Sequence, residues 1–171
     1  MTIVLAANAM VLLVGPSGSG KSTFAARHLR PTQVLSSDEL RARVMDDPND
    51  QSATDAAFEL LHAILALRLA RGRLSVVDAT NVEAWARAPL LAAARRNRRP
   101  AVAIVFALPL EELLQRATER MDRRVPPAAL RRQQRWLARS MTELPNEGLH
   151  AIWTLDSVAA VDGAAVTIQP G

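Results

Sequence analysis

A short stretch near the N-terminus combines glycines, one lysine and hydroxyl side chains at a spacing suited to holding phosphate groups. Residues 15–23 read Gly-Pro-Ser-Gly-Ser-Gly-Lys-Ser-Thr and fit the P-loop pattern G-x-x-x-x-G-K-[ST]. The glycines allow tight turns, so that successive backbone N–H groups point toward phosphate oxygens, while Lys21 would reach the β- and γ-phosphates. The hydroxyl of Ser22 would ligate Mg²⁺. The predicted nucleotide-binding residues of this loop are Gly15, Ser17, Gly18, Ser19, Gly20, Lys21, Ser22 and Thr23.

The segments on either side of this loop favour phosphate binding over an unliganded glycine-rich turn. The apolar run at 10–14 predicts a buried strand. Residues 22–29 predict a helix whose N-terminal N–H groups and dipole would face an anion. Lys21 is also the only lysine among the 21 basic residues of the chain. Together these features predict that the loop binds a nucleoside triphosphate.

Asp38 follows a predicted strand and is the candidate for proton transfer at the phosphate. It comes after the strand expected at 33–36, and Arg41 lies three residues further on, on the same face of a short helix. A kinase needs a carboxylate that orients the attacking hydroxyl and accepts its proton. We therefore expect Asp38 to be catalytic and Arg41 to hold the acceptor or neutralise phosphate. We also expect Ser37 or Asp38 to cap this helix, and the alternative to catalysis is that the Asp38 carboxylate serves only as that cap.

Asp78 ends the hydrophobic strand expected at 74–77 and resembles the acidic residue of a Walker B element. Such an acid supports Mg²⁺ directly or through water. We therefore expect Asp78 and Ser22 to form the metal site. The alternative is an ordinary turn residue at the end of a strand.

Three arginines lie at i, i+4 and i+7 on the helix predicted over 110–122, namely Arg116, Arg120 and Arg123. Directed across a phosphate site, they would stabilise charge that develops on the transferred γ-phosphoryl group. This arrangement is typical of the lid of a P-loop kinase, here at about residues 110–127. A solvated helix face is the alternative, and the basic stretch at 116–139, which carries eight arginines, could also hold a polynucleotide backbone.

Short apolar runs alternate with helical patterns along the chain, which predicts βαβ units and a parallel sheet. The expected fold is α/β: a P-loop kinase-type three-layer sandwich, in one domain over 1–171, with a mostly parallel five-stranded sheet. Ligands bind at the carboxyl ends of such strands, where the loop and both aspartates fall. Strands are expected at 10–14, 33–36, 74–77, 101–107 and 151–155, and helices at 22–29, 39–44, 55–71, 83–97 (with a break or a second start at Pro89), 110–122 and 128–144. The ends are weakly patterned, with a strand or loose end at 2–5 and an edge strand at 165–168.

The amino-acid composition indicates which kind of partner the protein binds and in which compartment it works. The chain has 49% hydrophobic and 22% charged residues, a net charge of +4 and an isoelectric point near 11.1, which favour an anionic partner. Without cysteine it can form neither disulfides nor thiolate metal sites, and its three histidines are scattered. No stretch is apolar enough to span a bilayer, so we expect a cytoplasmic protein. The three tryptophans show no interleaving with basic residues and are expected in the core: Trp85, Trp136 and Trp153.

Several of these motifs occur together in one known family. Beside the P-loop stand Ser36-Ser37-Asp38 with Arg41, the segment Asp-Asp-Pro-Asn-Asp-Gln at 46–51, and Val-Val-Asp-Ala-Thr-Asn at 76–81. From about residue 11 to residue 155 the chain resembles the N-terminal kinase module of bacterial polynucleotide kinase-phosphatases, the end-healing enzymes of RNA repair.

The resemblance implies transfer of the γ-phosphate of ATP, or of another nucleoside triphosphate, to the 5′-OH end of RNA or DNA. It assigns the general base to Asp38, acceptor positioning to Arg41 and a place near the acceptor strand to Gln51. Lys21 and Ser22 would bind the triphosphate and Mg²⁺, and the lid arginines would contact the nucleotide. In this family the kinase precedes phosphatase and ligase modules, which do not fit in 171 residues. The chain is expected to be either an excised module or a free-standing relative.

Two other functions fit the same motifs. A small-molecule P-loop kinase, for a sugar acid or similar alcohol, would share the P-loop, Asp38 and the lid, but would enclose its acceptor in a closed pocket. A non-catalytic nucleotide-binding module would bind nucleotide without transferring phosphate to an alcohol.

Overall fold

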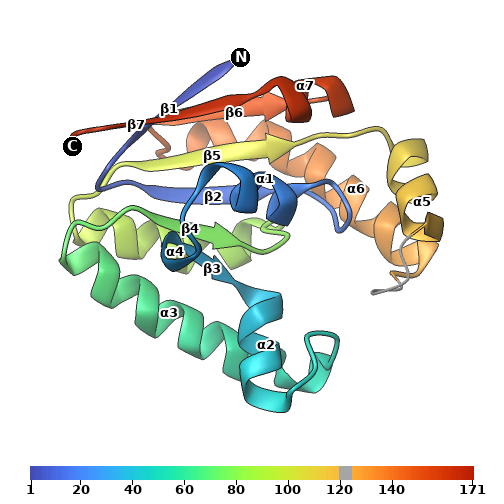
Figure 1. Ribbon diagram of the computed structural model, residues 1–171, viewed down its shortest axis with the longest axis horizontal. Helices are drawn as coiled ribbons and strands as arrows, with labels where there is room; N and C mark the ends of the chain where they lie inside the picture. The colour runs from blue at the N-terminus through green and yellow to red at the C-terminus, as the bar shows by residue number, and fades with distance from the viewer. Residues whose placement is uncertain (120–124) are drawn as a thin grey trace.

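The strand that precedes the P-loop lies at the centre of a five-stranded parallel sheet with the order β3-β4-β2-β5-β6 (Figure 1). This is a computed structural model, and it describes residues 1–119 and 125–171. The register pairs Leu13 with both Asp78 and Ile104, and Ser36 with Asp78, so the carboxyl ends of three neighbouring strands lie together. The strands are β2 (Met10–Val14), β3 (Val34–Ser36), β4 (Ser75–Asp78), β5 (Ala101–Phe106) and β6 (Ala151–Leu155).

Helices cover both faces of this sheet and make the predicted three-layer sandwich. Every residue of β2 is buried, since Met10, Leu12 and Val14 pack into one core and Val11 and Leu13 into the other. Burial on both faces explains why the strand is a continuous apolar run. One face packs against α3 (Thr54–Ala70), α4 (Ala84–Arg96) and most of α6 (Pro127–Glu143); the other packs against α1 (Lys21–His28), α5 (Leu110–Glu119) and α7 (Val158–Gly163).

The chain termini form a second, two-stranded parallel sheet. β1 (Thr2–Ala6) pairs with β7 (Ala165–Gln169), and Ile3 and Leu5 of β1 are buried in the core that α1 and α7 share. The strand predicted at 165–168 is therefore present, but it pairs with the N-terminus instead of with the edge of the main sheet. The short helix α7 had no clear pattern in the sequence; the Oγ of Ser157 caps it by accepting from the N–H of Ala160 at 3.2 Å.

Two expectations about α4 are wrong. The helix runs through Pro89 without a break, because Leu90, Leu91 and Ala94 pack into the core and outweigh one missing hydrogen bond at an exposed proline. Trp85, in its first turn, was expected in the core but is 73% exposed. No helix among the described residues has both the length and the apolar character needed to cross a bilayer.

Candidate active site

The P-loop wraps the space at the carboxyl end of β2 with its backbone. Gly18 and Gly20 adopt left-handed conformations, with φ of 79° and 96°, which side chains of other residues rarely tolerate. A Cβ on Gly15 would lie 2.8 Å from the carbonyl oxygen of Phe106, so the loop also needs a glycine where it passes β5. Lys21 opens α1 and is buried; its Nζ donates to the carbonyls of Gly15 and Pro16, each at 2.8 Å.

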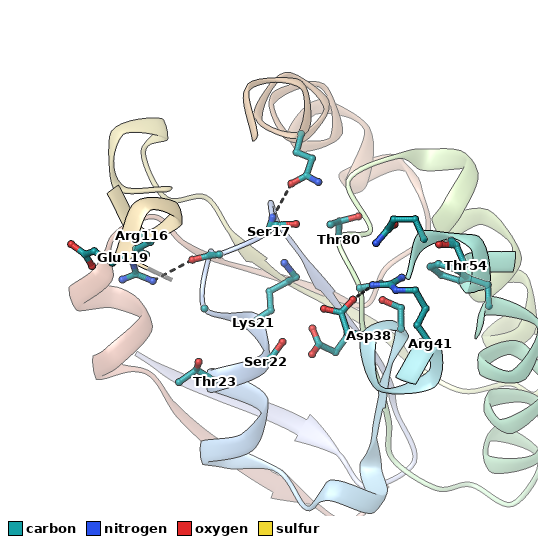
Figure 2. A pocket seen from close by; sticks show the side chains of 18 residues that line it. Ser17, Lys21, Ser22, Thr23, Asp38, Arg41, Thr54, Thr80, Arg116 and Glu119 are labelled. Carbon is teal, nitrogen blue, oxygen red and sulfur yellow. Dashed lines mark hydrogen bonds and ion pairs between the residues drawn. The ribbon is translucent and has the colours of Figure 1, made fainter. Parts of the chain in front are cut away.

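A cavity of about 540 Å³ lies over this loop and collects most of the predicted site residues. Figure 2 shows Asp38 and Arg41 on one side of it, Arg116 on the opposite side and Lys21 between them. Gly15 and Ser19, which are both buried, are not among the residues that line the cavity. The predicted residues that line the cavity are Ser17, Gly18, Gly20, Lys21, Ser22, Thr23, Asp38, Arg41, Gln51, Asp78 and Arg116.

Asp38 and Arg41 form an ion pair at the edge of the cavity. The Arg41 side chain is only 5% exposed, and its Nε donates to the carbonyl of Pro48 at 2.9 Å, so it also fixes the loop after α2 (Ser37–Met45). The expectation that Ser37 or Asp38 caps this helix is wrong. The cap is Ser36, whose Oγ accepts from the N–H of Glu39 at 3.4 Å. The Asp38 carboxylate is therefore not used as a cap and can face the P-loop.

Gln51 reaches the cavity from a short 3₁₀ helix, Gln51–Ala53. Asp50 caps that helix, because its Oδ1 accepts from the N–H of Ser52 at 2.9 Å and from the Ser52 hydroxyl at 2.6 Å. These two hydrogen bonds hold the pKa of the Asp50 carboxyl below its usual value. Thr54 and Phe58, from the start of α3, complete this wall.

Asp78 and Ser22 both line the cavity, as a shared metal site requires. Asp78 is 5% exposed at the end of β4, between β2 and β3. Among residues 1–119 and 125–171, no group of three histidine or acidic side chains could hold a metal ion. A hydroxyl and one carboxylate beside a backbone cradle suit Mg²⁺, which keeps several waters and takes its remaining ligands from substrate phosphates. The donor set therefore fits a nucleotide-bound magnesium ion.

Arg116 brings the predicted lid to the P-loop. Its Nε pairs with Oε1 of Glu112 at 2.5 Å, and its Nη1 lies 3.5 Å from the carbonyl oxygen of Gly18. The other two predicted lid residues, Arg120 and Arg123, lie outside the described residues, so their placement and the extent of the lid stay predictions.

Two polar residues contact the P-loop or its strand and were not predicted to do so. The N–H of Ser17 donates to Oε1 of Gln133, on α6, at 2.8 Å. Asn81 adopts φ 48° after β4, and its Nδ2 donates to the carbonyl of Leu13 at 2.8 Å. The sequence signal for Asn81 was its place three residues after Asp78, in the Val-Val-Asp-Ala-Thr-Asn segment. Gln133 carried no local signal, because its partner is 116 residues away.

Arg87 holds the segment that follows Asp78. It is fully buried on α4, and its Nε and Nη2 contact the two carboxylate oxygens of Glu147 at 2.8 and 2.5 Å. Its Nη1 donates to the carbonyl of Asn81 and to Ser140 Oγ, both at 2.8 Å. One residue before Asn81, the carbonyl of Thr80 accepts from the N–H of Gly15 at 2.9 Å. The buried guanidinium is thus joined to the first residue of the P-loop through a single short loop.

Solved structures share this fold. The chain is similar to a protein in the structure of the Pnkp1/Rnl/Hen1 RNA repair complex (23% identity, TM-score 0.69), where the match covers 79% of this chain and 45% of that one. It is also similar to a gluconokinase from Sinorhizobium meliloti (20%, 0.54; 88% and 83% covered). Shikimate kinase from Acinetobacter baumannii matches with 22% identity and a TM-score of 0.53 (90% and 87% covered).

The chain spans less than half the length of the RNA repair protein that it matches. No curated protein matches it in sequence. Residues 10–140 match the family described as AAA domain, AAA_33, and this segment holds the P-loop, both aspartates and Arg116. Family match, parallel sheet and P-loop agree with one another. The chain belongs to the AAA_33 family of AAA domains and has the α/β fold of P-loop kinases.

Proposed function

We propose that this protein is a polynucleotide 5′-hydroxyl kinase, which transfers the γ-phosphate of ATP or another nucleoside triphosphate to the 5′-OH end of RNA or DNA. The observation that carries the proposal is that Asp38, Arg41 and Gln51 line the same cavity as the P-loop, with Asp38 and Arg41 on the side opposite Arg116. A triphosphate and an alcohol can therefore meet between the two sides.

The transfer needs one proton acceptor and one fixed geometry. The acceptor hydroxyl gives its proton to the Asp38 carboxylate as its oxygen attacks the γ-phosphorus. The bond from that phosphorus to the bridging oxygen breaks, and the nucleoside diphosphate leaves. Arg41 holds Asp38 in place through the ion pair and is itself anchored on Pro48. Positioning of this kind supplies a large part of the rate in phosphoryl transfer.

The P-loop and the lid carry the charge of the triphosphate. Lys21 would exchange the carbonyls of Gly15 and Pro16 for phosphate oxygens, and Arg116 would exchange part of its contact with Glu112. Such donors stabilise the transition state when they already point at the developing charge. Mg²⁺, bound through Ser22 and Asp78, would neutralise the β- and γ-oxygens.

A sugar acid would need a dedicated cation for its carboxylate. Among the described residues that line the cavity, the cations are Lys21, Arg41 and Arg116. Two of them belong to the phosphate side, and Arg41 pairs with Asp38. This favours an acceptor whose reacting end is neutral, such as a 5′-OH terminus. An enzyme with this acceptor would act in nucleic acid repair, where phosphatase and ligase modules would carry out the accompanying steps.

The test is transfer of labelled γ-phosphate to an oligonucleotide with a 5′-OH end. Asp38→Ala should reduce kcat by about a hundredfold or more, the usual effect of removing a general base. Glu39→Ala removes the neighbouring exposed carboxylate and should leave the rate near that of the parent. An Asp38→Ala variant that keeps most of the rate contradicts the assignment of the base.

The same assay separates the alternative functions. Transfer to gluconate or shikimate but not to the oligonucleotide would identify a small-molecule kinase. Nucleotide binding without transfer to any alcohol would identify a non-catalytic binding module.

A further inference from the structure

Trp85 is the most exposed large hydrophobic side chain of the described residues, at 73%. A tryptophan in the first turn of α4 gains nothing for folding from this position. It lies on the segment that leaves the active site, because Asp78, Ala79 and Thr80 line the main cavity and α4 begins at Ala84. An aromatic side chain is therefore exposed seven residues after Asp78, which lines the main cavity.

A second tryptophan faces the same hollow from another helix. Trp85 and Trp136 both line a cavity of about 310 Å³, although 51 residues separate them. The guanidinium of Arg132 lies 5.3 Å from the ring centroid of Trp136, which is cation–π distance. The aromatic and basic residues that are not interleaved along the chain are thus brought together by the fold.

Helix α6 contributes side chains to both this cavity and the main one. Gln133 lines the main cavity, and Trp136 and Arg139, which line the second, follow at i+3 and i+6. At 1.5 Å per residue, the step from Gln133 to Arg139 is about 9 Å along the helix. Stacked nucleotides rise about 3.4 Å each, so this length corresponds to about three nucleotides.

The charge of α6 suits a polyanion. The helix carries four exposed arginines and one acidic residue, Glu143. Glu143 pairs with Arg139 at 2.7 Å and lies 3.8 Å from Arg87, so its charge is balanced inside the fold. Glu83 is the other acid in the lining. The exposed arginines are Arg131, Arg132, Arg135 and Arg139.

We propose that Trp85 and Trp136, with Arg132 and Arg139, bind the single-stranded nucleotides that follow the 5′ end of the acceptor. This inference rests on the proposed function. The rings stack on bases and the arginines contact phosphates, a combination that binds single strands with little sequence preference. The site explains how a chain with a small reaction cavity holds a long acceptor.

The test compares a long and a short acceptor. Trp85→Ala should raise KM about tenfold for an octanucleotide with a 5′-OH end, the effect of losing one stacked base. KM for a nucleoside 3′-monophosphate, which is too short to reach Trp85, and KM for ATP should not change. Leu67→Ala, which truncates another exposed apolar residue, is the matched control. Equal KM values of Trp85→Ala and parent for the octanucleotide overturn the inference while the proposed function stands.

Direct binding tests the site without phosphoryl transfer. Anisotropy of a labelled octanucleotide should show about tenfold weaker binding to Trp85→Ala than to the parent, and Trp85→Phe should recover part of it. If the parent phosphorylates neither acceptor, the proposed function fails. Weaker binding of the octanucleotide to Trp85→Ala than to the parent would still support the proposed binding surface. Equal binding of the octanucleotide to the parent and to Trp85→Ala contradicts the proposed binding surface. A parent dimer that Trp85→Ala converts to monomers in light scattering would assign the patch to self-association and also contradict it.

Discussion

Two arginines flank the P-loop and are held in opposite ways. Arg87, on the α4 side, is fully buried and bonds to Glu147, Asn81 and Ser140. Arg116, on the α5 side, is 27% exposed; it pairs with Glu112 and makes a long contact of 3.5 Å with the loop. The same side chain is thus part of the scaffold on one side and at the cavity surface on the other.

The difference follows from solvation. A buried guanidinium loses its hydration, so it is tolerated only where protein groups replace that hydration, and removing a partner leaves a buried charge unpaired. An exposed pair is screened by water and contributes little to stability, so its arginine can exchange a carboxylate for a phosphate at small cost. We infer that the α4 side fixes the site and the α5 side responds to nucleotide.

The largest effect should follow Arg87→Met, which keeps the apolar stem and removes the charge. Glu147 would then lack its main partner, and we expect the free energy of unfolding to fall by about 3 kcal/mol. For a chain of this size, that lowers Tm by about 6 to 12 °C. Arg96→Met, at an exposed position of the same helix, is the control. Equal Tm values for Arg87→Met and Arg96→Met would show that Arg87 stabilises the fold no more than an exposed arginine does.

Arg87→Met with Glu147→Leu tests whether the unpaired charge causes that loss. Removing both charges should restore part of the stability, because no buried charge is then left without a partner. A double variant that is no more stable than Arg87→Met would show that the loss does not come from the unpaired Glu147 carboxylate and would assign it to the hydrogen bonds to Asn81 and Ser140, which both variants lack.

Arg116→Ala should reduce activity strongly and stability little, the opposite of what we expect for Arg87→Met. Removing one donor from the phosphate site should lower kcat by about a hundredfold, while Tm stays within about 2 °C because the ion pair is partly exposed. Circular dichroism melts and the phosphate-transfer assay measure the two quantities on one sample. Glu112→Ala, which removes only the partner, is the control and should retain most of the activity. A loss of stability comparable to that of Arg87→Met would place both arginines in the scaffold.

The sequence predicted the residues that line the main cavity better than the buried contacts on the α4 side. The P-loop, Asp38, Asp78 and Arg116 are close to one another because parallel strands end at one edge of a sheet, which is a property of the fold class. The five strands of the main sheet were likewise predicted from apolar runs that are buried on both faces. Local pattern was sufficient for these features.

The features that the sequence did not predict depend on contacts between distant residues. Arg87 and Glu147 are 60 residues apart, and a buried arginine has the same sequence signal as an exposed one. The exposure of Trp85 was missed because a large aromatic residue usually favours the core. The pairing of β1 with β7 joins the two ends of the chain, which no periodicity within either segment indicates.

Asn81 offers a smaller test of the α4 side. Asn81→Ala removes the hydrogen bond to Leu13 and places alanine at φ 48°, so we expect a loss of about 1–2 kcal/mol. Asn81→Gly also loses the hydrogen bond but tolerates the backbone conformation, and should lose less. Urea titrations of the two variants separate the loss of the hydrogen bond from the backbone strain at this position. Equal losses would show that only the hydrogen bond contributes.

The smallest effect concerns pH, because arginine does not titrate near neutrality and the contrast between its two positions should not depend on it. Burial, and for His28 also the charge of Arg27, lowers the pKa of His28 and His62 from the model-peptide value of 6.5. Below pH 6.5 the unfolded chain therefore binds protons that the folded chain does not, so stability should decline slightly from pH 7.5 to 5.5. Urea titrations of the parent and of a His28→Gln, His62→Gln variant measure this slope, which should be shallower in the variant. If the parent becomes more stable on acidification, groups other than these histidines dominate the pH dependence. If the difference in unfolding free energy between Arg87→Met and Arg116→Ala changes with pH over this range, the two arginines are coupled to titrating groups.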